Sequence, residues 1–222
     1  MKSAGNDIVA LQLINRERTC HPVFYSKFIT DIELDLYSRS DAMPFENFIW
    51  LLWSVKESVY KYLKRGDAAL VFSPSKIQVQ NIDLSDYHFN SFFEYNELES
   101  TSSNFYSGSI LCDGYLLYFQ SLIQSEFIAT VVNGQESFNH VYWGVQPIAS
   151  DNYTDQSKAV RTFALTKLAG LFPDYKLQFK KSPVGYPVLL NESTEMDIPV
   201  SFAHHGNYVA YSFQIDGRLN SK

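Results

Sequence analysis

The chain has 222 residues, and its hydrophobic content of 45% and charged content of 19% are ordinary for a folded globular protein. Its formal net charge of −6 excludes the basic surface that general nucleic-acid binding needs, and no stretch reaches the roughly 20 apolar residues that span a bilayer. The two cysteines, Cys20 and Cys112, form neither a disulfide framework nor a zinc motif, and we expect no secretory signal because Gln12 and Asn15 interrupt the apolar run Ile8–Ile14. We therefore expect a reduced, cytoplasmic setting.

One long helix is expected in the first half of the chain, from about Pro44 to Lys64. Asp41 or Pro44 can open it, and Gly66 follows as a stop. Because its apolar residues cover more than one face, the helix should be largely buried, laid across a sheet. Strands are expected to follow at Lys76–Gln80, Tyr106–Cys112, Tyr115–Ile123 and Phe127–Val132, with Asp113-Gly114 as a hairpin turn.

The second half repeats this order of a helix followed by strands. A helix is expected at about Asp155–Phe172, ended by Pro173. The expected strands are Tyr175–Lys180, Val188–Leu190, Val200–Phe202 and Tyr208–Ile215. The repeat predicts an α+β fold of two pseudo-symmetric lobes, each a long helix packed on an antiparallel sheet. We expect the boundary near Gly134, which gives a first lobe of residues 1–135 and a second of residues 136–222.

Three segments carry residues that are suited to chemistry. In Gly5-Asn6-Asp7-Ile8-Val9, a turn leads into an apolar strand with one acid at its head. In Trp53-Ser54-Val55-Lys56-Glu57-Ser58-Val59-Tyr60-Lys61, the residues Glu57 and Lys61 are four apart, so they share one face of the first helix. In Ala203-His204-His205-Gly206-Asn207-Tyr208, a strand ends in a polar turn that leads into another strand.

The first two segments resemble the 4′-phosphopantetheinyl transferase superfamily, in which a Gly-x-Asp strand precedes a Trp-Ser-x-Lys-Glu-Ser/Ala-x-x-Lys helix. Glu57 follows Asp7 by fifty positions, which is similar to the spacing in that family. In its double-length, surfactin-synthetase-activating branch, another half comes before the Gly-x-Asp strand. The matching pieces come last in this chain: Lys158-Ala159-Val160-Arg161, Gly185-Tyr186-Pro187 and Ala203–Ala210. The chain therefore looks like a circular permutant of that branch, in which the tail Asp216–Lys222 would join to Met1.

The resemblance implies that a serine hydroxyl of an apo-acyl or peptidyl carrier protein attacks the β-phosphate of coenzyme A and releases 3′,5′-ADP. Asp7 and Glu57 would hold Mg²⁺, and Glu57 would also help to activate the serine, directly or through water. Lys61 would contact the transferring phosphate. The nucleotide would be held by His204 at the phosphates, Arg161 and Lys181 as nearby cations, and the turn Gly185, Tyr186 and Pro187 at the adenine.

The residue types also allow plainer roles. Asp7 suits a turn at a strand end, Glu57 and Lys61 suit a helical salt bridge, and Lys181 suits a solvated strand end. Some positions depart from the family pattern. Tyr186 stands for the lysine of the Gly-Lys-Pro turn, Ala203 for a serine, and Val9 for a third acid of the double-length branch. These changes predict weaker contact with the 3′-phosphate of coenzyme A.

Two alternatives to an active transferase remain. One is a catalytically silent relative that binds coenzyme A or a carrier protein, and the other is a different fold with a sheet wrapped around a helix, such as a thioester hydrolase. For the transferase, we expect Lys56, Lys64 and Arg65 to form a basic patch that attracts an acidic carrier. Because a double-length chain can complete the site between its lobes by itself, we expect a monomer.

Overall fold

The computed structural model describes residues 2–38, 43–84, 93–95 and 104–215. Its first sheet has five strands in the order β1-β6-β5-β4-β2, and every neighbouring pair is antiparallel. The strands are β1 Gly5–Ala10, β2 Ile77–Leu84, β4 Asn104–Cys112, β5 Tyr115–Ile123 and β6 Phe127–Asn133. The N-terminal strand thus lies at one edge of this sheet, beside the last strand of the first lobe.

The second sheet has six strands in the order β3-β7-β11-β10-β9-β8. They are β3 Phe93–Tyr95, β7 Val141–Pro147, β8 Leu177–Lys181, β9 Pro187–Asn191, β10 Thr194–His205 and β11 Tyr208–Gln214. Neighbours are antiparallel except β3, which pairs with β7 in parallel. The short strand β3 therefore extends the second sheet although it comes from the first half of the sequence.

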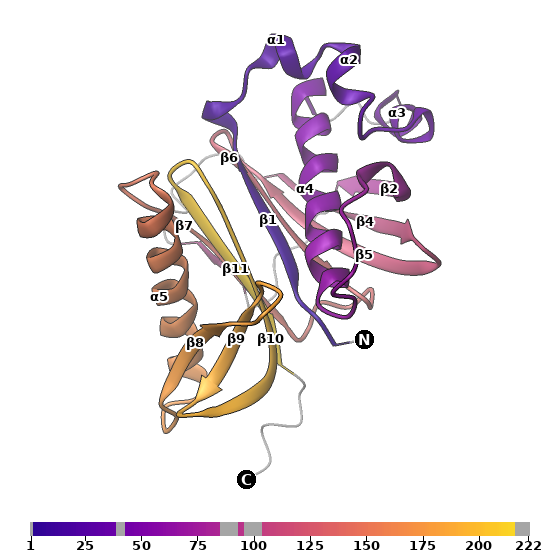
Figure 1. Cartoon of the computed structure of the whole chain (residues 1–222). Helices are drawn as coiled ribbons and strands as arrows, with labels where there is room; N and C mark the ends of the chain where they lie inside the picture. The colour runs from indigo at the N-terminus through magenta and orange to yellow at the C-terminus, as the bar shows by residue number, and fades with distance from the viewer. Residues whose placement is uncertain (1, 39–42, 85–92, 96–103, 216–222) are drawn as a thin grey trace.

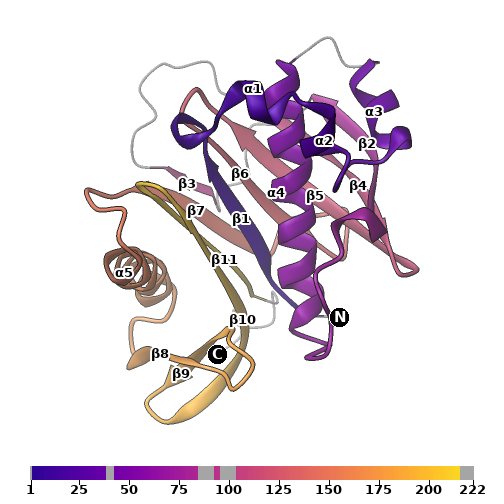
Figure 2. The same ribbon diagram turned by 45° about the horizontal axis from the view of Figure 1, so that its top comes forward.

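Two long helices cover the two sheets, α4 (Phe45–Lys64) on the first and α5 (Tyr153–Leu171) on the second. Figure 1 shows α5 at the left, on the outer side of the second sheet, and α4 at the right, lying across the first. The short helices are α1 Arg16–Thr19, α2 Pro22–Tyr25 and α3 Asp31–Ser38, with 3₁₀ turns η1 Leu11–Leu13 and η2 Pro74–Lys76. Figure 2 shows α1 and α2 gathered at the N-terminal end of α4.

Three hydrophobic cores lie in layers through the molecule. The first packs α4 against the first sheet, the second lies between the two sheets, and the third packs α5 against the second sheet. Strand β1 serves two of them, since Val9 belongs to the first core while Ile8 and Ala10 belong to the second. This follows from the alternation of side chains along a strand. It places the face of β1 that carries Asp7 toward α4.

The structure confirms the α+β fold with a long helix on each sheet. Helix α4 begins directly after Pro44, and the N–H of Gly66 closes its end by donating to Leu63 O. Helix α5 begins two residues earlier than expected because the Asn152 side chain caps it by accepting from the N–H of Asp155. Asp113 and Gly114 form the expected hairpin turn with positive φ angles of 47° and 80°.

Some expectations about organisation lie beyond these findings. The division after residue 135 falls between β6 and β7, and it remains a proposal. Two expectations involve residues outside the described ranges. One is the helix start at Asp41, and the other is the permutation, which would join the tail 216–222 to Met1. Both cysteines are free thiols. Within the described ranges, no helix combines the length and the apolar character needed to cross a membrane.

Candidate active site

Gly5 lets β1 approach α4 at very short range. A methyl group at this position would lie 2.2 Å from the backbone oxygen of Ser58 and 2.8 Å from Cβ of Tyr62. Contacts this short to backbone atoms cannot be relieved by rotating a side chain, so the strand can take this path only with glycine. Asp7 follows two residues later and therefore faces the same helix. The glycine of the Gly-x-Asp segment thus has a steric role in presenting the acid.

Asp7 and Glu57 meet at one cation. Lys61 Nζ donates to Asp7 Oδ1 at 3.0 Å and lies 3.3 Å from Glu57 Oε1, one helical turn away. Asp7 is buried, whereas Glu57 and Lys61 each keep part of their side chain open to solvent. The structure therefore brings together the three residues that the sequence singled out in its first half.

Burial of Asp7 raises the pKa of its carboxyl group to about 6, because the loss of hydration outweighs the attraction of Lys61, and Glu57 adds repulsion. Burial alone would lower the pKa of Lys61, but the charges of Asp7 and Glu57 raise it overall. Two carboxylates and one ammonium leave a net negative charge here. A carboxyl group with a raised pKa and a negative site are the properties expected where a further cation is needed.

The residues present fit a magnesium ion. Mg²⁺ prefers one or two carboxylates, with water and phosphate oxygens as the remaining ligands. Asp7 and Glu57 offer two such carboxylates within reach of a single cation. In the ranges that the structure describes, no three or more His, Cys, Asp or Glu side chains cluster as metal ligands, so the other ligands would be water and substrate. Val9, at the position of the third family acid, is buried in the first core.

His204 and His205 reach the same place from β10. The ring of His204 packs edge-on against Tyr153, 5.4 Å between centroids, and burial together with the charge of Lys61 lowers its pKa. His205 Nδ1 accepts a hydrogen bond from the N–H of Ala10 at 3.0 Å. When the ring of His205 is neutral, its proton is therefore on Nε2. The hydrogen bond from Ala10 therefore fixes His205 to β1. The neutral ring can donate a hydrogen bond from Nε2, but it cannot act as a base at Nε2.

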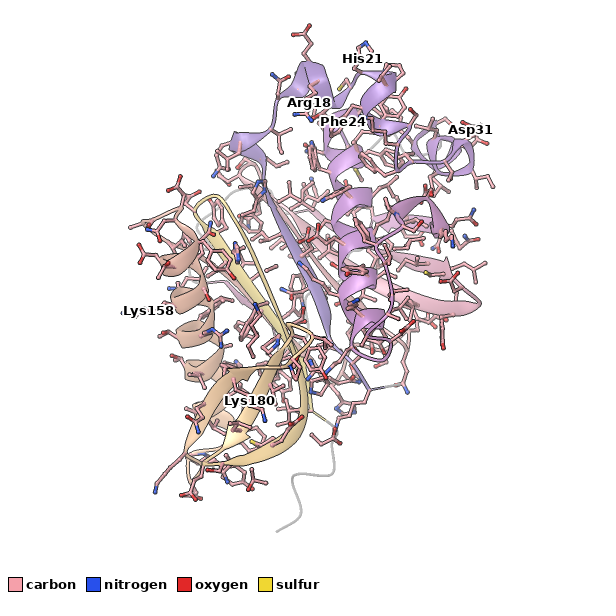
Figure 3. All side chains as sticks on the ribbon, viewed as in Figure 1. Arg18, His21, Phe24, Asp31, Lys158 and Lys180 are labelled. Atoms are coloured by element: carbon pink, nitrogen blue, oxygen red, sulfur yellow. The ribbon has the colours of Figure 1, made fainter. Side chains whose placement is uncertain are left out.

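A cavity of about 560 Å³ opens beside the N-terminal half of α4. Asp7, Glu57 and the two histidines line its polar end. The remaining wall is largely aromatic and is made by Phe24, Phe28, Trp50 and Trp53, with Arg18 and Lys27 adding positive charge. The guanidinium of Arg18 lies 5.1 Å from the centroid of Phe24, and Figure 3 shows the two side chains together near α1 and α2.

A second cavity, of about 280 Å³, follows toward the C-terminal end of α4. Lys61 lines it, and so does the turn Gly185, Tyr186 and Pro187. The turn is closed by Ser182, which accepts from the N–H of Gly185 and donates its own N–H to Tyr186 O. Gly185 has a φ of +103°, a conformation that side chains disfavour, and this explains the glycine. The acid pair and the predicted nucleotide turn therefore lie along the same helix.

The two other predicted nucleotide contacts lie at the border of this second cavity. The guanidinium carbon of Arg161 on α5 lies 5.8 Å from the ring centroid of Phe202, which lines the cavity, but Arg161 is not itself part of the lining. Lys181 is exposed, and its Cε would lie 3.8 Å from a Cβ placed on Gly185. The structure therefore places both predicted cations next to residues of the second cavity, but neither of them lines it.

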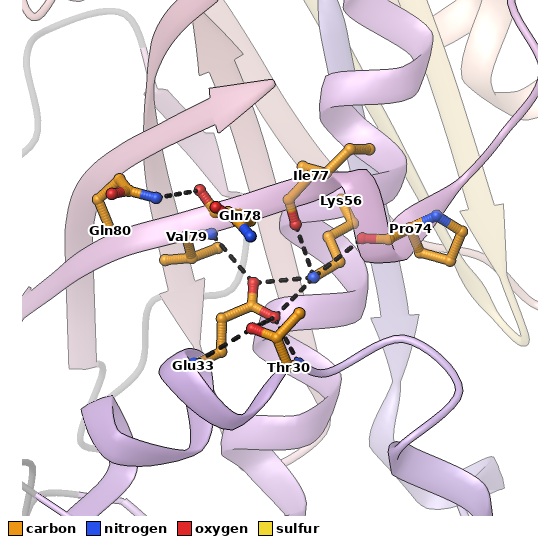
Figure 4. Close-up of polar contacts among 8 residues, drawn as sticks. All are labelled: Thr30, Glu33, Lys56, Pro74, Ile77, Gln78, Val79 and Gln80. Atoms are coloured by element: carbon orange, nitrogen blue, oxygen red, sulfur yellow. Dashed lines mark hydrogen bonds and ion pairs between the residues drawn. The ribbon is translucent and has the colours of Figure 1, made fainter. Parts of the chain in front are cut away.

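The expected surface patch of Lys56, Lys64 and Arg65 is wrong. Lys56 is completely buried, with Nζ 2.8 Å from Glu33 Oε1, and it donates to the backbone oxygens of Pro74 and Ile77 (Figure 4). Lys64 Nζ is tied to Ala68 O and Leu70 O, and Arg65 turns toward Tyr186. A lysine within the family helix was read as a surface charge because the sequence does not reveal its distant partner.

Sequence reasoning missed Arg18 and the aromatic wall, gave His205 no role, and assigned Arg65 to a carrier-binding surface. Arg18 and His205 enter the first cavity, and Arg65 enters the second. The doubling of histidine at positions 204 and 205 was visible but only the first matched the family pattern. No local signal marks Arg65 as a ligand residue, since its surroundings come from β9 and β10.

Comparison with known families agrees with the geometry. The model of the 4′-phosphopantetheinyl transferase superfamily matches residues 3–119, slightly more than half of the chain. The matched range includes Asp7, Glu57 and Lys61 and ends before the Gly185 turn and His204. No curated protein and no solved structure gives a significant match. The chain belongs to the 4′-phosphopantetheinyl transferase superfamily.

Proposed function

We propose that this protein transfers the 4′-phosphopantetheine arm of coenzyme A to a serine of an apo-acyl or peptidyl carrier protein in a Mg²⁺-dependent reaction that releases 3′,5′-ADP. One observation carries the proposal: Asp7 and Glu57, fifty positions apart in sequence, both contact the ammonium of Lys61. That arrangement offers two carboxylates for a divalent cation and one ammonium for a phosphate in the same place.

The two cavities along α4 suit the two halves of the donor. The second cavity, with Gly185 and Pro187, would hold the nucleotide. The first cavity continues from the acid pair and is largely aromatic, so it would take the uncharged pantetheine arm and the incoming serine. Lys61 lines the second cavity and contacts Asp7 and Glu57, which line the first, so the pyrophosphate would lie beside these three side chains.

The chemistry requires charge neutralisation and alignment more than covalent help. The serine oxygen forms a bond to the β-phosphorus, the bond from that phosphorus to the bridging oxygen breaks, and 3′,5′-ADP leaves with the electron pair. Glu57 would accept the serine proton, directly or through water, and Lys61 would stabilise charge on the phosphate oxygens. His204 would donate a hydrogen bond to a phosphate of coenzyme A. Asp7 and Glu57 would hold Mg²⁺, which when bound neutralises pyrophosphate charge.

The test is to incubate the protein with apo-carrier proteins, coenzyme A and Mg²⁺ and then to weigh the carriers. A carrier that gains the phosphopantetheine mass with the wild type and the exposed control Lys158→Gln, but not with Glu57→Gln or after chelation, supports the proposal. Unmodified fatty-acid, polyketide and peptide-synthetase carriers would instead favour the alternative, a silent relative that binds coenzyme A or a carrier.

We further propose that the protein is a monomer and that it works in the cytoplasm. We also propose that it is a circular permutant of the double-length branch, with lobes of residues 1–135 and 136–222. The support for the permutation is the position of the nucleotide-binding segments. The Gly185 turn and His204, which precede the Gly-x-Asp strand in that branch, follow it in this sequence and yet lie along the same helix as the acid pair. Size measurement in solution tests the oligomeric state.

A further inference from the structure

The second cavity has a charge that stands out against the rest of the protein. The chain carries a formal net charge of −6, yet the charged residues that line this cavity are Lys61, Lys64 and Arg65, and its described lining contains no carboxylate. A lining whose charged side chains are cations favours an anionic ligand, and because Asp7 and Glu57 offset the charge of Lys61, that charge comes from Lys64 and Arg65. Lys61 is engaged with Asp7 and Glu57, and Lys64 with two backbone oxygens.

Arg65 is held in a defined position at the wall of this cavity. Its guanidinium carbon lies 4.5 Å from the ring centroid of Tyr186, and its Nη1 donates to Val200 O at 3.0 Å. Both terminal nitrogens also lie 3.5 Å from Pro187 O. A guanidinium has five N–H groups in a fixed plane, so these contacts leave donors for a ligand. Stacking on the ring orients that plane and reduces the entropy lost when an anion binds.

Tyr186 stands where the family pattern that the sequence resembles has the lysine of a Gly-Lys-Pro turn, and the guanidinium of Arg65 lies over this ring. The cation is therefore retained at the turn but is delivered from the end of α4. We propose that Arg65, held by Tyr186, recognises the 3′-phosphate of the coenzyme A donor. The inference rests on the proposed function, and it reverses the expectation that Tyr186 weakens this contact.

The position of Arg65 along the helix favours the 3′-phosphate over the pyrophosphate. Lys61 marks the pyrophosphate end, and Arg65 follows it by four residues, which is about 6 Å along a helix. A phosphate monoester on the ribose would be separated from the pyrophosphate in this way and carries close to two charges at neutral pH. Arginine binds such a group through two parallel hydrogen bonds, whereas lysine acts as a point charge.

The carboxylates near Arg65 do not occupy this role. Glu195 and Asp197 line a neighbouring hollow on the other side of Arg65 and Tyr186. Glu195 pairs with Lys180 at 3.6 Å, and Asp197 pairs with Lys2 at 2.9 Å. Each pairs with a cation of its own, and together with Tyr186 the two carboxylates only partly offset the lowering of the pKa of Arg65 by burial.

The test compares the binding of coenzyme A and of 3′-dephospho-coenzyme A by calorimetry, with Mg²⁺ present. The wild type should prefer coenzyme A by about 10-fold to 100-fold, the range expected for a charge-assisted hydrogen-bonded pair. Arg65→Gln should weaken coenzyme A binding by that factor and change dephospho-coenzyme A binding by less than about twofold. Lys158→Gln removes one charge from an exposed site on α5 (Figure 3) and should leave both affinities unchanged.

Two more variants keep the test decisive if Arg65→Gln is poorly folded. Tyr186→Leu keeps the charge but removes the ring, and it should reduce the preference for the 3′-phosphate severalfold. Adding Tyr186→Lys to Arg65→Gln places a cation back at the Gly-x-Pro turn and should restore the preference for the 3′-phosphate. Equal losses for the two ligands, or a wild type that binds both equally well, would overturn the inference while leaving the proposed function standing. A wild type that binds neither ligand would count against the proposed function instead.

Discussion

Lys56 of α4 and Glu33 of α3 form an ion pair in which both side chains are completely buried, with 2.8 Å between Nζ and Oε1. Glu33 also accepts hydrogen bonds from the N–H groups of Val79 and Thr30, and Lys56 donates to two backbone oxygens (Figure 4). The pair therefore ties α3, α4 and the start of β2 together. Because Lys56 and Glu57 are neighbours on α4, anchoring Lys56 also restrains rotation of the helix that carries Glu57.

Removing one member of this pair should be far more harmful than removing both. Lys56→Met leaves the Glu33 charge buried without a partner and should lower the free energy of unfolding by about 3–5 kcal/mol. The double variant Lys56→Met with Glu33→Leu should recover most of that loss, because two hydrophobic side chains need no hydration. Urea denaturation measures both.

The control for this prediction is an exposed ion pair. Lys176 and Glu192 lie 3.2 Å apart and keep 83% and 65% of their side chains exposed, so Lys176→Met should have almost no effect on unfolding. If Lys56→Met were tolerated as well as Lys176→Met, the Lys56–Glu33 pair would not be buried as the structure has it.

Local patterns predicted most of the fold. The apolar coverage of α4, the Asp113-Gly114 turn and the alternating strands around it depend on residues close in sequence, and they appear where expected. Helices α1–α3 were not expected because each is short and its stability depends on α4. Trp50 Nε1 donates to Thr19 Oγ1, and Arg16 pairs with Glu46 of α4. Strand β3 was missed for a similar reason, since only pairing with β7 defines it.

In the candidate site too, the sequence identified residues within a local pattern but not contacts between distant segments. Asp7, Glu57 and Lys61 could be named from the sequence because a dense pattern of residue types marks them. The partners of Lys56 and Arg65 could not, because Glu33 lies in another helix and Tyr186 lies 121 positions from Arg65. Burial decides both cases: it makes Lys56 structural, and it turns Arg65 from a surface charge into the lining of a cavity.

The stability of the metal-free protein should depend on pH through Asp7. Its pKa is raised from the ordinary 3.8 to about 6, so the folded protein binds this proton more tightly than the unfolded chain does. The stability from protonated Asp7 is full below about pH 4 and is lost as the pH rises through about 6. With chelator present, Asp7→Asn should therefore gain on the wild type between pH 4 and pH 7, by up to roughly 3 kcal/mol.

Denaturation curves of both proteins at several pH values measure this difference. A difference that stays constant from pH 4 to pH 7 would contradict the raised pKa. At pH 7, Mg²⁺ together with coenzyme A should raise the melting temperature of the wild type and have little effect on Asp7→Asn, because the variant lacks one of the two carboxylates. This comparison reads out the proposed metal site without using enzyme activity.

We expect His204 to bind the ligand and His205 to stabilise the structure. His205→Ala leaves the N–H of Ala10 without its hydrogen-bond acceptor and should lower stability by about 1–3 kcal/mol. His204→Ala should change stability little but raise the KM for coenzyme A about tenfold. Thermal melts and steady-state kinetics of the two single variants distinguish the roles, and the reverse pattern would contradict this assignment.

Gly5 should tolerate no side chain, for reasons of space. In Gly5→Ala the new methyl group would lie 2.2 Å from Ser58 O, so β1 must move away from α4 or α4 must shift as a whole. Either movement separates Asp7 from Lys61, which now approach to 3.0 Å. We expect a loss of stability of about 2–4 kcal/mol and a fall in transfer rate of at least about 100-fold, since small displacements of catalytic groups are costly.

Gly170→Ala is the matched control, because the same change is made at the C-terminal end of α5, where the new methyl group would meet nothing within 4 Å apart from its chain neighbours and the helix's own backbone. Alanine favours a helix over glycine by about 0.5–1 kcal/mol, so this variant should melt at the same or a slightly higher temperature. Its transfer rate should equal that of the wild type. If Gly5→Ala behaved like Gly170→Ala, the close approach of β1 to α4 could not be what presents Asp7, and the steric account of the Gly-x-Asp segment would fail.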